Sequence, residues 1–359
     1  MSRVLAVATA LPGPPRDQDA ITQVVAPLVA GDDARTAGLL RRVHRSSGVR
    51  TRHLALDPGE YAGIRDFGHA NDLYLAVGTD LAERAVHEAL SGAGVHPADV
   101  DLVLFTSVTG IGAPSVDATL VGRLGMRDDV KRLPSFGLGC AGGAAGLARV
   151  HDYLVGHPDG TALLVCLELC SLTLQHADRD PAALVANGLF GDGAAAAVVV
   201  GPAHPAAAAA RGPRIEDTRS RLVPGTSGEL GWRIGASGFR IVLSAEVPDV
   251  VRAEVATDVK RLLAGQGLEP RDVTRWVVHA GGPRILDAVE EALDLPADAL
   301  DASRESLAAV GNLSSASVLD VLGRTLRTDP PPGSPGVLLA FGPGVGVETV
   351  LLRWSPTEG

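Results

Sequence analysis

A glycine- and alanine-rich run that contains one cysteine is the feature of this sequence that most constrains its fold. The run extends from Pro134 to Gly146, with Cys140 near its middle. From Ala141 onward its apolar residues can cover nearly every face of a helix, and a helix that is apolar all round is a buried one. Glycine and alanine also let neighbouring backbones come close. The pattern therefore predicts a buried helix that begins directly after Cys140.

Cys140 has a functional and a structural interpretation. At the first turn of a helix, unpaired N–H groups and the helix dipole stabilise a thiolate, which makes a cysteine there a useful nucleophile. A lone cysteine among small residues is also commonly a core residue. The run alone leaves both interpretations open.

The same run contains the spacing G-x-G-x-x-G at Gly137, Gly139 and Gly142, which occurs in dinucleotide-binding proteins. That motif follows a strand, and residues 133–136 are a poor strand sequence. The motif also expects an acidic residue about 20 positions on, at the end of a following strand, and none stands there. We therefore set a nucleotide-binding function aside.

Composition excludes several classes of function. The chain has 359 residues, enough for two domains or one large layered domain. Its net charge of −10 argues against a nucleic-acid partner, which would favour a basic face. The only lysines are Lys131 and Lys260, and neither lies in a motif, so Schiff-base chemistry is not expected.

Compartment is indicated by the cysteines and by the absence of long apolar runs. Cys140, Cys166 and Cys170 form no disulfide pattern, which suggests a reducing environment. The N-terminal apolar run is too short for a signal peptide, and no uninterrupted stretch reaches the roughly 18 apolar residues of a membrane span. We therefore expect a cytoplasmic protein that does not enter a membrane.

Strands and helices alternate along the chain. Short apolar runs predict buried strands, and apolar residues spaced three and four apart predict helices. The expected strands are residues 4–8, 101–108, 162–169, 194–200, 241–247, 275–279, 337–341 and 347–354. The expected helices are residues 24–49, 71–93, 141–154, 250–263, 283–293 and 314–326.

This alternation predicts an α/β protein whose helices cover mixed sheets. Both halves of the chain show it, which suggests a duplicated unit with the site between the halves. The Pro- and Ala-rich stretch 201–214 is a natural boundary. We therefore divide the chain into residues 1–205, which carry Cys140, and residues 206–359.

Two residues of the second half stand in loops at element ends, where α/β proteins build their sites. His279 ends a predicted strand, and Asn312 precedes a predicted helix. Alone, His279 can be a structural histidine and Asn312 a helix cap. Together with Cys140 they fit a nucleophile, a base and a hydrogen-bond donor.

Motifs along the whole chain resemble those of one enzyme family. Residues 139–143 around Cys140, 189–194, and 277–287 with His279 are similar to the thiolase superfamily. Residues 311–315 with Asn312 and residues 340–349 narrow the resemblance to the type III polyketide synthases, the chalcone-synthase-like enzymes. The resemblance implies a thiolase fold with five layers, αβαβα, built from two duplicated halves, and a homodimer.

The resemblance also implies a reaction, which is repeated decarboxylative condensation of malonyl-CoA onto an acyl-CoA starter. Cyclisation then gives a pyrone, a resorcinol or another phenolic product. A Cys140 thiolate paired with protonated His279 would attack the starter thioester. His279 and Asn312 would then bind the oxygen of the enolate that forms when malonyl-CoA loses CO2. CoA thioesters are the substrates, and no metal, cofactor or catalytic carboxylate is needed.

Further positions match residues that shape the family's substrate pocket. Phe190 matches a gatekeeper phenylalanine, although it can also be a core residue before a tight turn. Ile241 replaces a second gatekeeper phenylalanine, and Ala113 replaces a methionine that reaches into the partner subunit in plant enzymes. Both changes suggest a differently shaped and roomier pocket. The other matches are Thr173, Ser314, Phe341, Gly342 and Pro343.

An arginine cluster near the N-terminus has two interpretations. It contains Arg41, Arg42, Arg45, Arg50 and Arg52. Such a cluster is usually a solvated face, but it can also bind the phosphates of an anionic substrate. The resemblance places Arg42 and Arg45 near the family's CoA-phosphate contacts.

Two other functions remain as alternatives. A priming ketoacyl synthase, which uses an acyl carrier protein, usually has a Gln-Ala-Asn-like run around its histidine, and here Ala280, Gly281 and Gly282 follow His279. A non-catalytic binding subunit of the same fold would be expected to have lost Cys140, His279 or Asn312, and all three are present.

Overall fold

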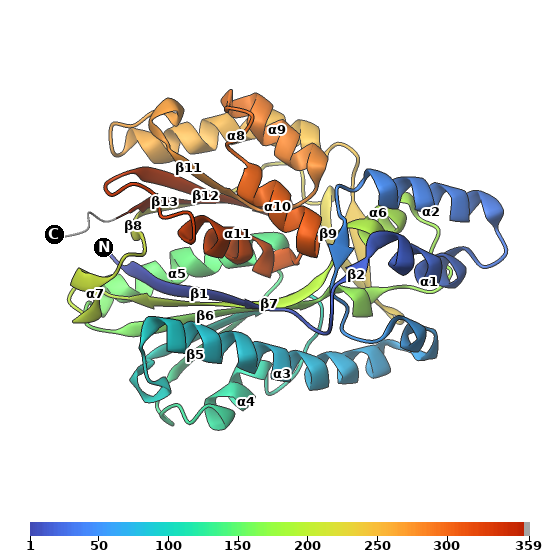
Figure 1. Cartoon of the computed structure of the whole chain (residues 1–359), viewed down its shortest axis with the longest axis horizontal. Helices are drawn as coiled ribbons and strands as arrows, with labels where there is room; N and C mark the ends of the chain where they lie inside the picture. The colour runs from blue at the N-terminus through green and yellow to red at the C-terminus, as the bar shows by residue number, and fades with distance from the viewer. Residues whose placement is uncertain (355–359) are drawn as a thin grey trace.

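The computed structural model describes residues 1–354 of the chain. Nine strands pair in the order β11-β12-β13-β8-β1-β7-β6-β4-β5. β8 and β1 are joined through a single residue pair, Arg214 with Arg3, so the order divides there into a C-terminal and an N-terminal half. Figure 1 shows these halves stacked, with helices above, between and below them. The expected α/β fold with five layers is confirmed.

The N-terminal half of the sheet is mixed. β1 and β6 run antiparallel to β7, whereas β4 runs parallel to both β6 and β5. Its strands are β1 (Arg3–Ala10), β7 (Asp192–Val200), β6 (Thr161–Leu169), β4 (Leu102–Ser107) and β5 (Lys131–Phe136).

The C-terminal half is also mixed. β8, β13 and β12 are antiparallel neighbours, and β11 pairs parallel with β12. Its strands are β8 (Arg214–Leu222), β13 (Gly346–Arg353), β12 (Pro335–Gly342) and β11 (Arg275–Val278). Each half of the sheet thus lies between two layers of helices, which shield most of its strands from water.

Helices form three layers around these strands (Figure 1). The central pair is α5 (Gly142–Gly156) and α11 (Ser317–Leu326). The N-terminal half is covered by α3 (Phe67–Ala93) and α4 (Val116–Arg123), and the C-terminal half by α8 (Val247–Ala264), α9 (Pro283–Leu293) and α10 (Asp301–Val310). Within residues 1–354, no helix combines the length and the apolar character that crossing a membrane requires.

Smaller elements gather at the end of the molecule where the site forms (Figure 1). They include the helices α1 (Gln18–Ala30), α2 (Ala34–Ser46) and α6 (Pro181–Leu189), and the strand pairs β2 (Arg16–Asp17) with β3 (Thr51–Arg52) and β9 (Leu230–Gly235) with β10 (Gly238–Leu243). The 3-10 turns are distributed along the chain: η1 (Pro58–Gly63), η2 (Pro97–Asp99), η3 (Gly139–Ala141), η4 (Cys170–Thr173), η5 (Pro270–Asp272) and η6 (Ser314–Ala316). A short helix, α7 (Ala206–Ala209), lies between β7 and β8.

The predicted buried helix after Cys140 is confirmed as α5. A Cβ atom at Gly143 would lie 2.5 Å from the carbonyl oxygen of Ser315, and one at Gly146 would lie 2.4 Å from Leu164 Cδ1. A side chain at Gly143 would clash with backbone, and one at Gly146 would have to displace the Leu164 side chain. The small residues therefore do let the backbone of α5 approach η6 and β6 directly.

The prediction that residues 133–136 make a poor strand is wrong, because they belong to β5. Pro134 is tolerated because β5 pairs only with β4 and so leaves one edge free of sheet hydrogen bonds. A strand therefore does precede the glycine run. This removes one of the two reasons given above against a dinucleotide motif.

Other sequence boundaries also needed correction. The single helix expected over residues 24–49 is two helices, α1 and α2, because Gly31 adopts a positive φ of 55° that ends the first. The strand expected over residues 241–247 is β10, which ends at Leu243, and Val247 begins α8. Strands β8 and β9 and helices α4, α6 and α10 were not predicted.

Candidate active site

Cys140 lies in η3, the turn that leads directly into α5, as the sequence predicts. The preceding Gly139 has a positive φ of 51°, and a Cβ atom on it would lie 2.6 Å from Pro343 Cδ. Gly342 is equally close to this turn, since its Cβ atom would lie 2.5 Å from the carbonyl oxygen of Leu138. The predicted Phe341–Pro343 segment therefore packs against the turn that presents Cys140.

Asn312 reaches Cys140 through the segment that follows it. Cys140 Sγ lies 3.7 Å from Ser314 Oγ, to which it donates a hydrogen bond. Asn312 Oδ1 accepts hydrogen bonds from the Ser314 backbone N–H at 2.8 Å and from Ser317 Oγ at 3.3 Å. These bonds fix the amide so that its NH2 group is the end left to act as a donor. Ser314, predicted as a pocket residue, thus contacts the cysteine itself.

His279 enters the same site from the end of β11. Its backbone N–H donates to the Leu339 carbonyl at 2.8 Å, and the residue is 2% exposed. The Gly281 carbonyl accepts a hydrogen bond from Asn312 Nδ2 at 3.4 Å. A Cβ atom on Gly281 would lie 3.3 Å from His279 Nε2, so glycine leaves room beside the ring. Contacts from Cys140 through Ser314, Asn312 and Gly281 to His279 bring the three predicted residues together.

Burial disfavours the charged forms of Cys140 and His279. It raises the pKa of the Cys140 thiol, although hydrogen bonding with Ser314 and Asn312 lowers it. Burial also lowers the pKa of His279 to about 3. Nδ1 of His279 is buried and has no hydrogen-bond partner within residues 1–354. In the free protein the environment therefore favours a neutral thiol and imidazole over the expected thiolate and imidazolium.

A buried carboxyl group that the sequence analysis missed lies beside the site. Glu168, in β6, is fully buried and accepts hydrogen bonds from Ser315 Oγ at 2.6 Å and Thr109 Oγ1 at 2.8 Å. Burial raises its pKa to about 7, and its negative charge in turn raises the pKa of Cys140. A charged residue inside the otherwise apolar strand from Thr161 to Leu169 was the available signal. A carboxyl group therefore lies next to the Asn312–Ser315 segment, although the proposed reaction assigns it no catalytic role.

Phe190 is joined to Asn312 by backbone hydrogen bonds. Asn312 N–H donates to the Leu189 carbonyl at 2.8 Å, and Gly191 N–H donates to the Asn312 carbonyl at 2.9 Å. These bonds form an isolated parallel bridge between Phe190 and Asn312. The predicted gatekeeper therefore lies next to the predicted donor, on a segment fixed to the same loop.

Trp232 lies beside Ile241, where the sequence predicts a roomier substrate pocket. Ile241 pairs across the β9–β10 hairpin with Trp232. The Trp232 ring lies 6.2 Å from that of Phe190 and 6.3 Å from that of Phe239, measured between centroids. An indole thus fills the space across from the smaller Ile241. The sequence signal was an isolated tryptophan in a chain with only 3% aromatic residues.

Thr173 and Ala113, the two remaining predicted pocket residues, lie on segments other than the Cys140 turn. Thr173, in η4, donates through Oγ1 to the Cys170 carbonyl at 2.7 Å, and the following Gln175 ties this turn to the carbonyls of Ser237 and Phe239. Ala113 is exposed on the loop between β4 and α4. Within the single chain, Ala113 therefore does not line the site.

A cavity of about 400 Å³ opens beside the His279 loop. Its walls come from the end of α2, the start of α6, the segment after β10 and the start of α9; the residues that bear on function include Ser46, Ser47, Gly281, Gly282 and Arg284. Arg42 lies on α2 four residues before Ser46, on the same side of the helix. Arg45 instead lines a separate hollow between α1 and α2. Arg284 was not identified from the sequence.

Comparison with known proteins gives a consistent result over the whole chain. Sequence models of the chalcone and stilbene synthases match residues 1–205 with their N-terminal domain and residues 214–356 with their C-terminal domain. A 1,3,6,8-tetrahydroxynaphthalene synthase from Streptomyces peucetius subsp. caesius is 56% identical over 355 residues, which cover 98% of this chain and 93% of the relative.

A second such synthase, from Streptomyces coelicolor, is 35% identical over 324 residues, covering 89% of this chain and 84% of the relative. The crystal structure of 1,3,6,8-tetrahydroxynaphthalene synthase from Streptomyces coelicolor A3(2), a bacterial type III polyketide synthase, covers 99% of both chains with a TM-score of 0.92 and 31% identity.

Replacing Glu168 with glutamine should change how stability depends on pH. Because burial raises the pKa of Glu168 from 4.5 to about 7, its ionisation destabilises the folded protein as pH rises through this range. Glutamine stays neutral, so the unfolding free energy of the variant minus that of the wild type should increase by about 3 kcal/mol between pH 5 and pH 8. Urea unfolding at both pH values measures this difference, and an equal difference at the two would contradict the raised pKa.

Proposed function

Because the chain belongs to the chalcone and stilbene synthase family and is a type III polyketide synthase, we propose that Cys140, His279 and Asn312 are its catalytic residues. The observation that carries this proposal is the connected set of contacts that joins them across both halves of the chain. The comparisons do not favour an acyl carrier protein-dependent ketoacyl synthase or a non-catalytic binding subunit.

The first step loads the starter onto Cys140. As Sγ attacks the thioester carbonyl, its proton moves to His279 Nε2, the C–S bond to CoA breaks, and CoA leaves as a thiolate that is protonated by solvent. The neutral pair that burial favours is suited to this step, since the base is unprotonated before the attack. The proton then stays on Nε2, which becomes a hydrogen-bond donor.

The second step removes CO2 from malonyl-CoA. The electron pair of the broken C–C bond forms an enolate, whose oxygen accepts hydrogen bonds from His279 Nε2–H and the Asn312 amide. The Phe190 ring next to Asn312 offers the malonyl carboxylate no polar partner, which favours loss of its charge. No resident metal or cofactor is required, because decarboxylation supplies the carbanion.

The third step forms the new carbon–carbon bond. The enolate carbon attacks the acyl group on Cys140, the C–S bond to Cys140 breaks, and the chain, longer by two carbons, is now carried by CoA. The Cys140 thiolate reloads by attacking this new thioester and releasing CoA. Donors from Ser314 and Asn312 stabilise the thiolate between these steps.

CoA fits the cavity beside the His279 loop. The cavity leads from the surface to Gly281 and Gly282, the residues that follow His279. Arg284 lines it and Arg42 stands near it on α2, so both can reach the phosphates of CoA. Arg45, which faces the other hollow, is less well placed for this role.

The pocket favours a small starter. Trp232 occupies the wall between Phe190 and Ile241 and leaves less room for an aromatic or long-chain acyl group. The relative with 56% identity is a 1,3,6,8-tetrahydroxynaphthalene synthase. We therefore propose that malonyl-CoA serves as both starter and extender, and that the product is of the tetrahydroxynaphthalene type.

The edge of β5 is the proposed dimer face. Among residues 1–354, β5 has no strand partner on its outer side, and Leu133 and Phe136 on it are 48% and 50% exposed. Ile111, 43% exposed, lines the same surface hollow as Phe136. An uncovered strand edge with apolar side chains is a template for pairing with a second copy. This arrangement would bring Ala113, two residues after Ile111, to the partner subunit.

Mass spectrometry of products tests the reaction. Purified protein given malonyl-CoA alone should form a tetrahydroxynaphthalene-type product. Cys140→Ala should abolish it, because no acyl enzyme can form, while the oligomeric state stays unchanged. Unchanged turnover by Cys140→Ala would rule out the mechanism, and activity only with an acyl carrier protein would favour a ketoacyl synthase.

Trp232→Ala should widen starter choice. Removing the indole enlarges the wall beside Phe190, so kcat/KM with hexanoyl-CoA or benzoyl-CoA should rise by about 10-fold or more relative to wild type. The matched control is Ile234→Ala on the same strand, where the side chain is 54% exposed. If both variants keep the wild-type preference, Trp232 does not limit the pocket.

Leu133→Asp should yield a monomer. A carboxylate on the free edge of β5 would be buried without a partner in the proposed interface. Light scattering coupled to size-exclusion chromatography measures the mass in solution. Val155→Asp, at a residue 67% exposed on α5, is the control and should remain dimeric. A dimeric Leu133→Asp variant would place the interface elsewhere.

A further inference from the structure

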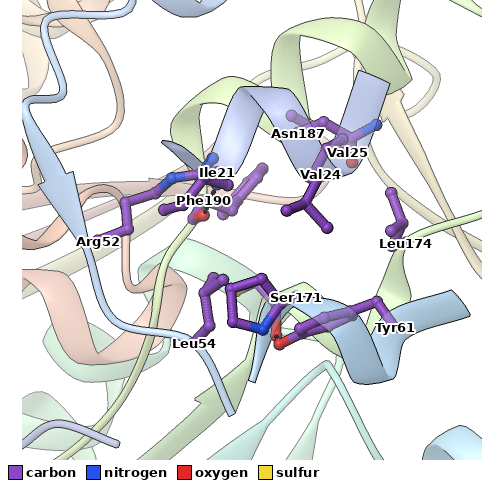
Figure 2. Close-up of a pocket in the computed structure, with 13 residues that line it drawn as sticks. Ile21, Val24, Val25, Arg52, Leu54, Tyr61, Ser171, Leu174, Asn187 and Phe190 are labelled. Carbon is purple, nitrogen blue, oxygen red and sulfur yellow. Dashed lines mark hydrogen bonds between the residues drawn. The ribbon is translucent and has the colours of Figure 1, made fainter. Parts of the chain in front are cut away.

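A buried arginine, Arg52, borders the small cavity shown in Figure 2. The cavity has a volume of about 40 Å³, and Arg52 is 3% exposed. Its Nε donates to Gln18 Oε1 at 3.0 Å, and its Nη1 donates to the Phe190 carbonyl at 2.6 Å. Its Nη2 is buried and has no hydrogen-bond partner within residues 1–354. Arg52 is therefore attached directly to the backbone of the gatekeeper.

Arg52 also supports the loop that carries Asn312. Gly311 has a positive φ of 75°, and a Cβ atom on it would lie 3.1 Å from Arg52 Cγ and 3.2 Å from Arg52 Cδ. The next residue, Asn312, is the one bridged to Phe190. One side chain thus contacts both segments of the bridge, the first through its guanidinium and the second through its aliphatic part.

Packing alone does not account for an arginine at this position. The hydrogen-bonded partners of Arg52 within residues 1–354 are an amide and a carbonyl, and none is a carboxylate. Burial lowers its pKa to about 10 and the charge of the buried Asp192 partly offsets this effect, so Arg52 stays charged at neutral pH. A buried charge that makes no hydrogen bond to a carboxylate is costly relative to an apolar side chain of similar volume. The guanidinium is therefore retained for what it positions.

We propose that Arg52 is a positioning residue for the decarboxylation step, holding the Phe190 carbonyl and the Gly311–Asn312 turn in one fixed arrangement. This inference rests on the proposed function, in which Phe190 and Asn312 act on the malonyl group. In acylation of Cys140, Asn312 contributes only a hydrogen bond to the sulfur and Phe190 takes no part, so loading should depend much less on Arg52 than decarboxylation does. Displacing a catalytic group by about 1 Å can cost roughly 10²-fold in rate.

The test separates loading from decarboxylation in the full-length protein. Loading is read from the intact mass of the protein after rapid mixing with malonyl-CoA or acetyl-CoA, and decarboxylation from release of labelled CO2 from malonyl-CoA. Arg52→Met should lower CO2 release by about 10²-fold and leave loading within about 3-fold of wild type. The rate of CO2 release by Arg52→Lys should fall between those of wild type and Arg52→Met, because an ammonium group cannot hold both Gln18 and Phe190 in the same way.

Chemical rescue adds a readout that packing cannot produce. Arg52→Ala extends the existing cavity next to Phe190, so millimolar guanidinium should enter and restore part of the CO2 release. Urea, which is neutral and of similar shape, should not. Equal effects of guanidinium and urea would overturn the role of the charged donor.

Arg3→Met is the matched control. Arg3 is 8% exposed and its Nη1 donates to the Ala210 carbonyl at 2.6 Å; it begins β1, at the end of the molecule opposite α1, α2 and α6 (Figure 1). This variant should lower thermal stability without separating the two steps. If Arg52→Met slows loading and CO2 release equally, or leaves both unchanged, the inference is wrong. Wild-type protein that releases no CO2 from malonyl-CoA would instead overturn the proposed function itself.

Discussion

The direct backbone contact between the start of α5 and η6 is the constraint on which the site depends. A Cβ atom at Gly143 would lie 2.5 Å from the Ser315 carbonyl oxygen, and one at Gly142 would lie 2.9 Å from Ser315 Cβ. The two glycines thus join the nucleophile turn of the first half to the Asn312 segment of the second. Any larger side chain would separate Cys140 from Ser314. The same glycines made the segment recognisable in the sequence, because close approach leaves no other choice of residue.

Features with a local cause could be predicted from the sequence. The apolar period of α5, the strand before His279 and the loop before α11 each follow from neighbouring residues, and the structure has them. Features set by position in the sheet could not. Residues 131–136 form a strand despite Pro134 because they lie at an edge, and this position is fixed only when β4 is in place. Strand β9 was missed although Leu230, Trp232 and Ile234 alternate along it, because it is short and two of its six residues are glycines.

The site residues divide in the same way. Cys140, His279 and Asn312 stand in motifs, so sequence comparison finds them. Trp232, Arg52 and Glu168 act through partners far away in the chain: Trp232 through Phe190, Arg52 through Phe190 and Gly311, and Glu168 through Ser315. No spacing rule links such pairs. The prediction of a roomier pocket considered the loss of a ring at Ile241 without the indole of Trp232, which pairs with Ile241 across the hairpin.

In the proposed mechanism, burial hinders formation of the Cys140 thiolate but helps to remove the charge of the malonyl carboxylate. It raises the pKa of Cys140 and lowers that of His279, so it makes the thiolate harder to form before the substrate arrives. The same dry surroundings disfavour the malonyl carboxylate and strengthen each hydrogen bond to the enolate oxygen. Glu168 responds to this environment as well, because its raised pKa lets it take a proton near neutral pH and so limits the negative charge near Cys140. In the proposed mechanism, low polarity favours the decarboxylation step, and in the loading step Ser314 and Asn312 offset part of its effect on the sulfur.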